Sequence, residues 1–139
     1  MRPLTILSIA YSLAPVGPDA VGGAEQILSA LDHALVAAGH RSIVVACEGS
    51  TGAGTLLQTA PVPDPITEAA RRRVNDSQRR AVARALSRWP VDIIHAHGLD
   101  FAESLSPPGV PTLVTLHLAA PFYPPGTVCE RRPRTWFRL

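Results

Sequence analysis

The sequence contains no lysine, because all thirteen basic residues among its 139 residues are arginine. A phosphate-loop lysine, a Schiff-base lysine and a lysine general base are therefore excluded. Long apolar runs are also missing: the longest, such as residues 43–47, are far shorter than the roughly 20 residues that cross a bilayer. The only cysteines are Cys47 and Cys129, and without a CxxC spacing they indicate neither a disulfide framework nor a zinc ribbon.

The charges nearly balance, with a formal net charge of +2, so the composition gives no reason to expect a nucleic-acid partner. Hydrophobic residues make up 46% of the chain, which supports a packed core in one domain. Arg2 and the apolar stretch after it resemble a signal peptide, but no small-x-small cleavage site precedes the first expected helix. We therefore expect a cytoplasmic protein.

Short apolar segments alternate with longer amphipathic ones. Strands are predicted at residues 5–10, 42–47, 91–97 and 111–117, with a weaker one at 56–59, and helices at residues 24–38, 65–89 and 100–105. This alternation predicts an α/β fold, a Rossmann-like parallel sheet of at least four strands with flanking helices. We expect this domain to span residues 1–127, followed by a basic tail rich in proline, arginine and aromatic residues at 128–139.

Both long helices show one apolar stripe. In the first, the residues expected to face inward are Ala24, Ile27, Leu28, Leu31, Ala34, Leu35 and Ala38. In the second, they are Ile66, Ala70, Val74, Ala81, Ala85, Leu86 and Trp89, and the arginines expected to face outward are Arg71, Arg72, Arg73, Arg79, Arg80, Arg84 and Arg88. A solvated surface is expected for this arginine face, with peripheral contact to the anionic inner membrane as the alternative.

Two glycines lie just before the first helix, at an end of a parallel strand where such folds bind ligands. At Gly22 and Gly23 the backbone N–H groups and the dipole of the helix could meet a phosphate directly. The alternative is a plain turn that needs only the conformational freedom of glycine. Glu25, in the first helical turn, suits the positive end of the helix dipole.

Three histidines come at the ends of neighbouring strands. His95 and His97 point to one side of their strand because side chains alternate, and His117 ends the next strand. We expect the three to gather at one sheet edge, close to Gly22 and Gly23. Such a group could ligate a metal ion, or it could form hydrogen bonds with a polyol or a phosphate.

Taken in order, these segments resemble the N-terminal domain of glycosyltransferase family 4. The resemblance rests on "GGAE" at 22–25, "LVAAGH" at 35–40, "VDIIHAHG" at 91–98 and "PTLVTLH" at 111–117, and it covers residues 3 to about 125. It implies a GT-B fold and a retaining transferase that uses a nucleotide-sugar donor, with a sugar, polyol or lipid as acceptor and no cofactor or metal.

The resemblance also implies roles for individual residues. Gly22 and Gly23 would approach the diphosphate of the donor, and His117 would lie at the reaction centre as the candidate catalytic residue. His97, with His95 beside it, would belong to the acceptor side of the cleft. Glu25 would support the glycine loop.

The family's second domain, with its basic pair and two glutamates eight positions apart, has no counterpart in the sequence. We therefore expect an incomplete acceptor-side domain that is inactive without a donor-binding domain. Two alternatives remain at this point. One is a metal-dependent hydrolase that uses His95, His97 and His117, and the other is a non-catalytic module that binds a nucleotide or phosphate.

Overall fold

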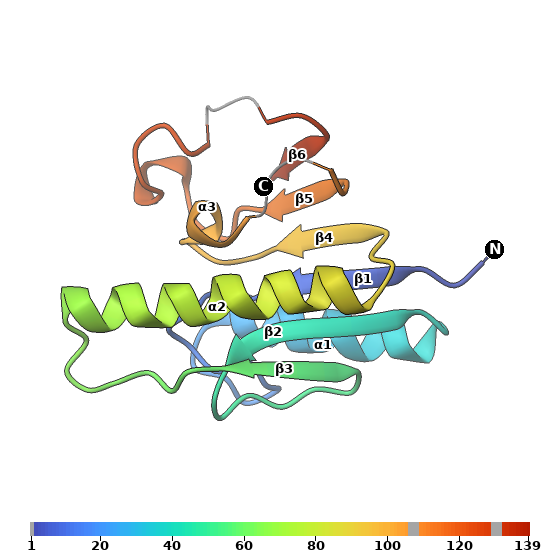
Figure 1. Cartoon of the computed structure of the whole chain (residues 1–139), viewed down its shortest axis with the longest axis horizontal. Coiled ribbons are helices and arrows are strands. Elements are labelled where there is room, and N and C mark those ends of the chain that lie inside the picture. Colours follow the sequence, from blue (N-terminus) through green and yellow to red (C-terminus); the bar gives the residue numbers. More distant parts are fainter. Residues whose placement is uncertain (1, 106–108, 129–131) are drawn as a thin grey trace.

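A six-stranded parallel sheet forms the centre of the protein (Figure 1). The computed structural model describes residues 2–105, 109–128 and 132–139. The strands are β1 (Thr5–Ile9), β2 (Arg41–Cys47), β3 (Thr55–Thr59), β4 (Ile93–Ala96), β5 (Thr112–Thr115) and β6 (Thr135–Arg138). The helices are α1 (Gly23–Ala37), α2 (Glu68–Arg88) and α3 (Phe101–Ser104), with a 3-10 helix η1 (Ala120–Phe122). The spatial order β3-β2-β1-β4-β5-β6 confirms the Rossmann-like α/β fold.

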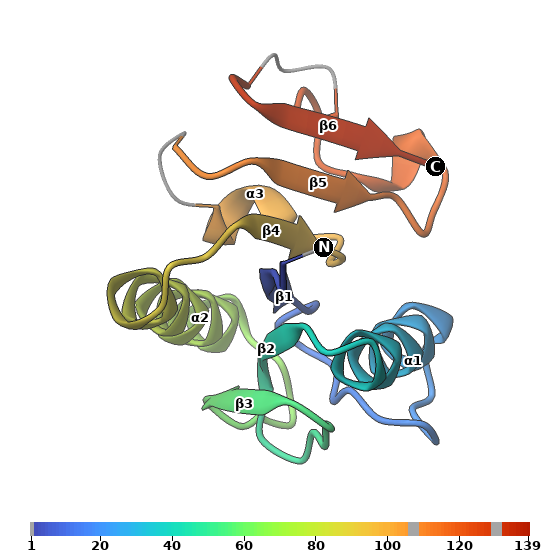
Figure 2. The same ribbon diagram turned by 90° about the vertical axis from the view of Figure 1, so that its right-hand side faces the viewer.

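Helices cover the sheet from both sides: α2 and α3 lie on one face and α1 lies on the other (Figure 2). The core under α2 joins strand residues such as Leu7, Ile43 and Ile94 to Ala81 and Val82 of the helix. Burial on both faces explains the nearly continuous apolar character of the central strands. The first and third predicted strands lie side by side, because β1 and β4 are parallel neighbours.

Local signals set the helix ends. Gly39, with φ of +87°, ends α1 in a Schellman motif, in which its N–H donates to the carbonyl of Val36 and the N–H of His40 donates to that of Leu35. α2 begins three residues later than the predicted start at residue 65, because Thr67 caps it. The Thr67 hydroxyl accepts a hydrogen bond from the Ala70 N–H at 3.1 Å.

The predicted apolar stripe of α1 is correct only in part, because Leu28 is buried and Ala24, Leu31 and Leu35 are half-buried. The buried residues of the helix are Glu25, Leu28, Ser29 and Asp32, whereas Ala34, Ala38 and Ile27, the last with an exposed fraction of 54%, face solvent. Asp32 accepts hydrogen bonds from the Ser42 hydroxyl at 2.6 Å and from the Ala53 N–H at 2.7 Å. These bonds satisfy the buried carboxylate and hold the helix with a polar face toward the sheet.

The orientation of α2 largely agrees with the prediction. Ala70, Val74, Ala81 and Ala85 are buried, and the seven arginines predicted to face outward are all exposed. Ile66 is the exception, because it precedes the helix and is 45% exposed. In the described part of the chain, no helix has both the length and the apolar character needed to cross a membrane.

The last strand lies inside the segment that the sequence pattern predicts to be a tail. β6 pairs in parallel with β5, with Leu113 beside Trp136 and Val114 beside Phe137. The side chain of Phe137 packs against the cluster around Phe101. The sheet therefore has two strands more than the four that the sequence predicts at minimum. Cys47 is a free, buried cysteine, and Cys129 lies outside the described residues.

Candidate functional site

A cavity of about 390 Å³ opens at the carboxyl ends of β1, β4 and β5, where α1 begins. Its lining residues are Tyr11, Gly22, Gly23, Ala24, Glu25, Ile27, His97, Leu99, His117, Leu118 and Tyr123. Five of these are residues that the sequence singles out, and they come from three separate segments. The structure thus brings the glycine loop and two of the three histidines into one hollow.

The two glycines of the cavity differ in the space that surrounds them. Gly22 is the N-cap of α1, and a Cβ on it would collide with the carboxylate of Glu25. Gly23 is the first residue of the helix, and a Cβ there would meet nothing within 4 Å. A side chain at Gly22 would therefore displace the Glu25 carboxylate, whereas the space at Gly23 stays open beside N–H groups that the helix cannot pair.

Glu25 is a buried carboxylate in the wall of the cavity, with an exposed fraction of only 7%. Its negative charge lies in the first turn of α1, at the positive end of the helix dipole, which favours it. Its negative charge also raises the pKa of His117, against the larger, lowering effect of burial. Glu25 therefore contributes charge to the cavity as well as supporting the glycine loop.

His97 and His117 meet directly. His97 follows β4, His117 follows β5 by two residues, and the Nδ1 atom of His97 lies 3.1 Å from the Nε2 atom of His117. The two rings are stacked, with centroids 5.4 Å apart and planes 22° apart. Burial, with smaller effects from His95 and His117, lowers the pKa of His97 to about 2, so this ring is neutral at physiological pH.

His95 lies beside this pair but does not line the cavity. Its ring centroid is 3.9 Å from that of His97, and its Nε2 atom is 2.7 Å from the hydroxyl of Thr115. Burial and the neighbouring His117 lower the pKa of His95 to about 4. The structure therefore confirms that the histidines gather, and it places His95 behind His97 rather than against a ligand.

Two tyrosines complete the site without having been singled out from the sequence. Tyr11 follows β1, and Tyr123 follows η1 with an exposed fraction of 5%. The Tyr123 hydroxyl accepts hydrogen bonds from the N–H groups of His117 at 3.0 Å and Leu118 at 3.4 Å. Their positions after parallel strands are the available signal, but an aromatic residue there is also a common core residue.

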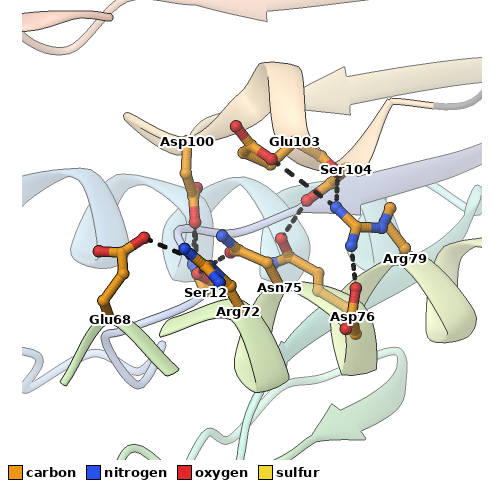
Figure 3. A network of polar contacts seen from close by, with 10 residues as sticks. Ser12, Glu68, Arg72, Asn75, Asp76, Arg79, Asp100, Glu103 and Ser104 are labelled. Atoms are coloured by element: carbon orange, nitrogen blue, oxygen red, sulfur yellow. Dashed lines mark hydrogen bonds and ion pairs between the residues drawn. The ribbon is translucent and has the colours of Figure 1, made fainter. Parts of the chain in front are cut away.

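A second hollow, of about 520 Å³, adjoins the first and shares Tyr11, Leu99 and Tyr123 with it. A polar network on its α2 side is drawn in Figure 3. The Ser12 hydroxyl bonds to the carboxylate of Asp100 and, at 3.0 Å, to the amide oxygen of Asn75. Burial raises the pKa of Asp100, and the bonds from Ser12 oppose this.

The same network anchors the loop that carries His97. Asp100 and Ser12 join the loops after β4 and β1, and a Cβ on Gly98 would lie 2.8 Å from the Cα of Tyr11. Arg79 of α2 pairs with Asp76 and lies 3.7 Å from the carboxylate of Glu103 in α3. These contacts tie the loops after β1 and β4 to α2.

The histidines do not form a metal centre. Within residues 2–105, 109–128 and 132–139, no three or more histidine, cysteine, aspartate or glutamate side chains are arranged to hold a metal ion. The ring nitrogens of His97 and His117 face each other, and that of His95 faces Thr115. The metal-dependent hydrolase considered from the sequence therefore has no ligand set in this part of the chain.

A protein-family model matches most of the chain. The family model described as Glycosyltransferase Family 4 matches residues 21–139, which include both glycines, the histidines and all of the strands after β1. No curated protein sequence matches the chain significantly. Because the family model covers far more than half of the sequence, the chain belongs to glycosyltransferase family 4.

Proposed function

We propose that this chain is the acceptor-side domain of a retaining, nucleotide-sugar-dependent glycosyltransferase. The observation that supports the proposal is the cavity in which the start of α1 faces His97 and His117 in a member of this family. The open space at Gly23 suits the approach of a donor diphosphate to backbone N–H groups. His117 lines the cavity beside the glycine loop, where the transferred sugar would lie.

The acceptor would enter from the side of His97 and the second hollow. That hollow combines charged and amide groups with the largely exposed ring of Phe122. Carboxylate, guanidinium and amide groups pair with hydroxyls through directional hydrogen bonds, and a flat ring packs against the apolar face of a sugar. This mixture favours a sugar or another polyol, free or as the head group of a lipid.

The described chain supplies one wall of the cleft, and we expect it to be inactive alone. Transfer requires a donor and an acceptor held in reacting geometry, with preorganised groups around the developing charge. A few N–H donors at the start of α1 offer about 1.5–3 kcal/mol each to a charged group. Ordering and desolvation offset much of that, so we expect donor affinity near millimolar, equivalent to about −4 kcal/mol.

The test measures transfer and binding separately. The 139-residue chain is assayed with a panel of radiolabelled nucleotide sugars, alone and after addition of a donor-binding domain from a family 4 relative. We expect weak binding and no transfer alone, and tighter binding with the added domain. Robust turnover by the chain alone, abolished in His117→Ala, contradicts the inactivity. Binding without any transfer in either arm favours the non-catalytic phosphate-binding module.

For location, we propose a cytoplasmic protein with a peripheral membrane contact through α2. The seven exposed arginines of this helix support the proposal, although Glu68, Asp76 and Glu103 pair with two of them. Basic helix faces bind anionic lipid. Co-sedimentation with phosphatidylglycerol vesicles at low salt, absent with phosphatidylcholine vesicles, is the expected result. Equal recovery with both kinds of vesicle contradicts the membrane contact.

A further inference from the structure

His97 occupies a closed position between the two other histidines of the site. Only 3% of the residue is exposed, and its backbone N–H donates to the Ile9 carbonyl at 3.0 Å, which fixes it beside β1. One side of its ring contacts His95, and its Nδ1 atom bonds to His117. The ring therefore has little freedom to turn or to change its partners.

The bond between the two histidines constrains where the protons lie. A neutral imidazole carries a single N–H, on either Nδ1 or Nε2. His97 is neutral because of its burial, and burial also lowers the pKa of His117. In the contact between His97 Nδ1 and His117 Nε2, one nitrogen therefore donates and the other accepts.

The far side of the His97 ring indicates which nitrogen donates. The Nε2 atom of His97 is buried and has no hydrogen-bond partner in the described part of the chain. A proton on Nε2 would be an orphaned buried donor, and such N–H groups are rarer in proteins than unfilled acceptors. A proton on Nδ1 is used in the bond to His117. His117 then accepts at Nε2 and carries its own proton on Nδ1.

We propose that His97 is a positioning residue that acts through His117, by holding the His117 ring in place with its proton on Nδ1. The Tyr123 hydroxyl fixes the backbone of His117, and His97 fixes the ring, so its remaining N–H is the group offered to a ligand in the cavity. Such a donor suits an oxygen acceptor, as in a hydroxyl of a bound sugar.

The tautomer of His117 is a property of this chain alone, whereas the sugar hydroxyl as its partner rests on the proposed function. The two parts can therefore fail separately. A fixed Nδ1–H tautomer without sugar binding leaves the positioning role intact and counts against the proposed function. If the tautomer of His117 does not depend on His97, the positioning role is overturned, whatever the chain binds.

The experiment is nitrogen-15 NMR of the histidine side chains in the 139-residue protein at pH 7.5. The nitrogen-15 chemical shifts of an imidazole distinguish a protonated from an unprotonated ring nitrogen. If His97 had a purely structural role, it would not determine which nitrogen of His117 is protonated. We expect His117 in the wild type to be protonated on Nδ1. In His97→Phe, which keeps a ring but removes both nitrogens, we expect His117 to become a mixture of tautomers.

Two further variants keep the test decisive. His97→Asn places a carboxamide N–H close to the former Nδ1 position, so it should restore the Nδ1–H tautomer of His117 even if His97→Phe folds poorly. Thr115→Val removes the partner of His95 without touching the His97–His117 bond, and it should leave His117 unchanged. An Nε2–H tautomer of His117 in the wild type overturns the proposal, as does an unchanged His117 in folded His97→Phe.

Discussion

The carboxylate of Glu25 fills the space in which a side chain on Gly22 would lie. The third residue of α1 thus occupies the space beside its N-cap, which is glycine although Ser, Thr, Asp and Asn are usually the better caps. The same carboxylate lines the cavity and acts electrostatically on His117. The glycine loop, the helix start and the histidine pair therefore form one electrostatic unit.

Removing the charge of Glu25 should lower the pKa of His117. The carboxylate is the cause that raises this pKa, so Glu25→Gln leaves only the lowering effect of burial. The pKa is measured by NMR titration of the His117 ring protons. Glu48→Gln is the matched control, because Glu48 is an exposed glutamate just beyond the end of β2. A His117 pKa that rises in Glu25→Gln would falsify the electrostatic link.

Gly23→Ala should stabilise the protein and weaken phosphate binding at the same time. The added methyl group meets nothing in the free chain, and alanine is favoured over glycine in a helix by about 0.5–1 kcal/mol. A bound phosphate that approaches the backbone at Gly23 would meet this methyl group.

Chemical denaturation and titration with inorganic pyrophosphate measure the two effects of Gly23→Ala. Gly109→Ala is the control, because that position is equally open and lies beside the amino end of β5, away from the cavity. If Gly23→Ala and Gly109→Ala bind pyrophosphate as the wild type does, no phosphate contacts the loop at Gly23.

Acid should destabilise the wild type more than His97→Asn. The folded-state pKa of His97 is about 2, below its ordinary value of 6.5, so the folded state binds fewer protons than the unfolded state. The stability that comes from a neutral His97 is complete above pH 6.5 and is lost as the pH falls toward the folded-state value. At about 1.4 kcal/mol per pH unit, the loss attributable to His97 is about 2 kcal/mol at pH 5.

Urea unfolding at pH 7.5 and pH 5 measures this difference in the wild type and in His97→Asn. His95 and His117, the titratable groups that act on His97, and Glu25, which acts on His117, are present in both proteins, so the comparison isolates His97. The same loss of stability in both proteins would show that His97 is not the group responsible.

Gln78→Ala should destabilise the protein by about 1–3 kcal/mol. This fully buried side chain donates from Nε2 to the Ala10 carbonyl at 2.8 Å and accepts a hydrogen bond from the Ser104 hydroxyl. Its removal leaves both partners buried without a bond. The free energy of unfolding is compared with that of Ser87→Ala, an exposed position on the same helix. A cost no larger than that of Ser87→Ala contradicts the role of Gln78 as a tie between α2 and β1.

The parallel α/β architecture and the gathering of the histidines could be predicted from the sequence because both rest on local patterns and on one rule about strand ends. Buried parallel strands are continuous apolar runs, and their carboxyl ends share one edge, so His97 and His117 must be neighbours once β4 and β5 pair. The identity of the bonded nitrogens depends on ring rotation within the packed core. No sequence pattern encodes that rotation.

The two features that the sequence pattern does not predict, the polar buried face of α1 and the strand β6, have a different physical origin. Hydrophobic periodicity assigns the face of α1 by its apolar residues, but Asp32 is buried because Ser42 and Ala53 donate to it. Those partners are 10 and 21 residues away in sequence, outside any helical period. β6 has too few apolar residues among the neighbouring arginines for the sequence pattern to indicate a strand. Its pairing with β5, which depends on the fold, is what identifies it as a strand.

β6 is an edge of the sheet in the described part of the chain, and its outer backbone groups have no neighbouring strand. An open sheet edge is a template for pairing with further strands. Trp136, which is 58% exposed, adds an apolar side chain to the edge formed by β6. The charge of Arg138 opposes the stacking of identical edges, more weakly as salt screens it. Solubility of the purified chain should therefore fall as salt rises, and a lysine in place of Trp136 is the simplest remedy for precipitation during concentration.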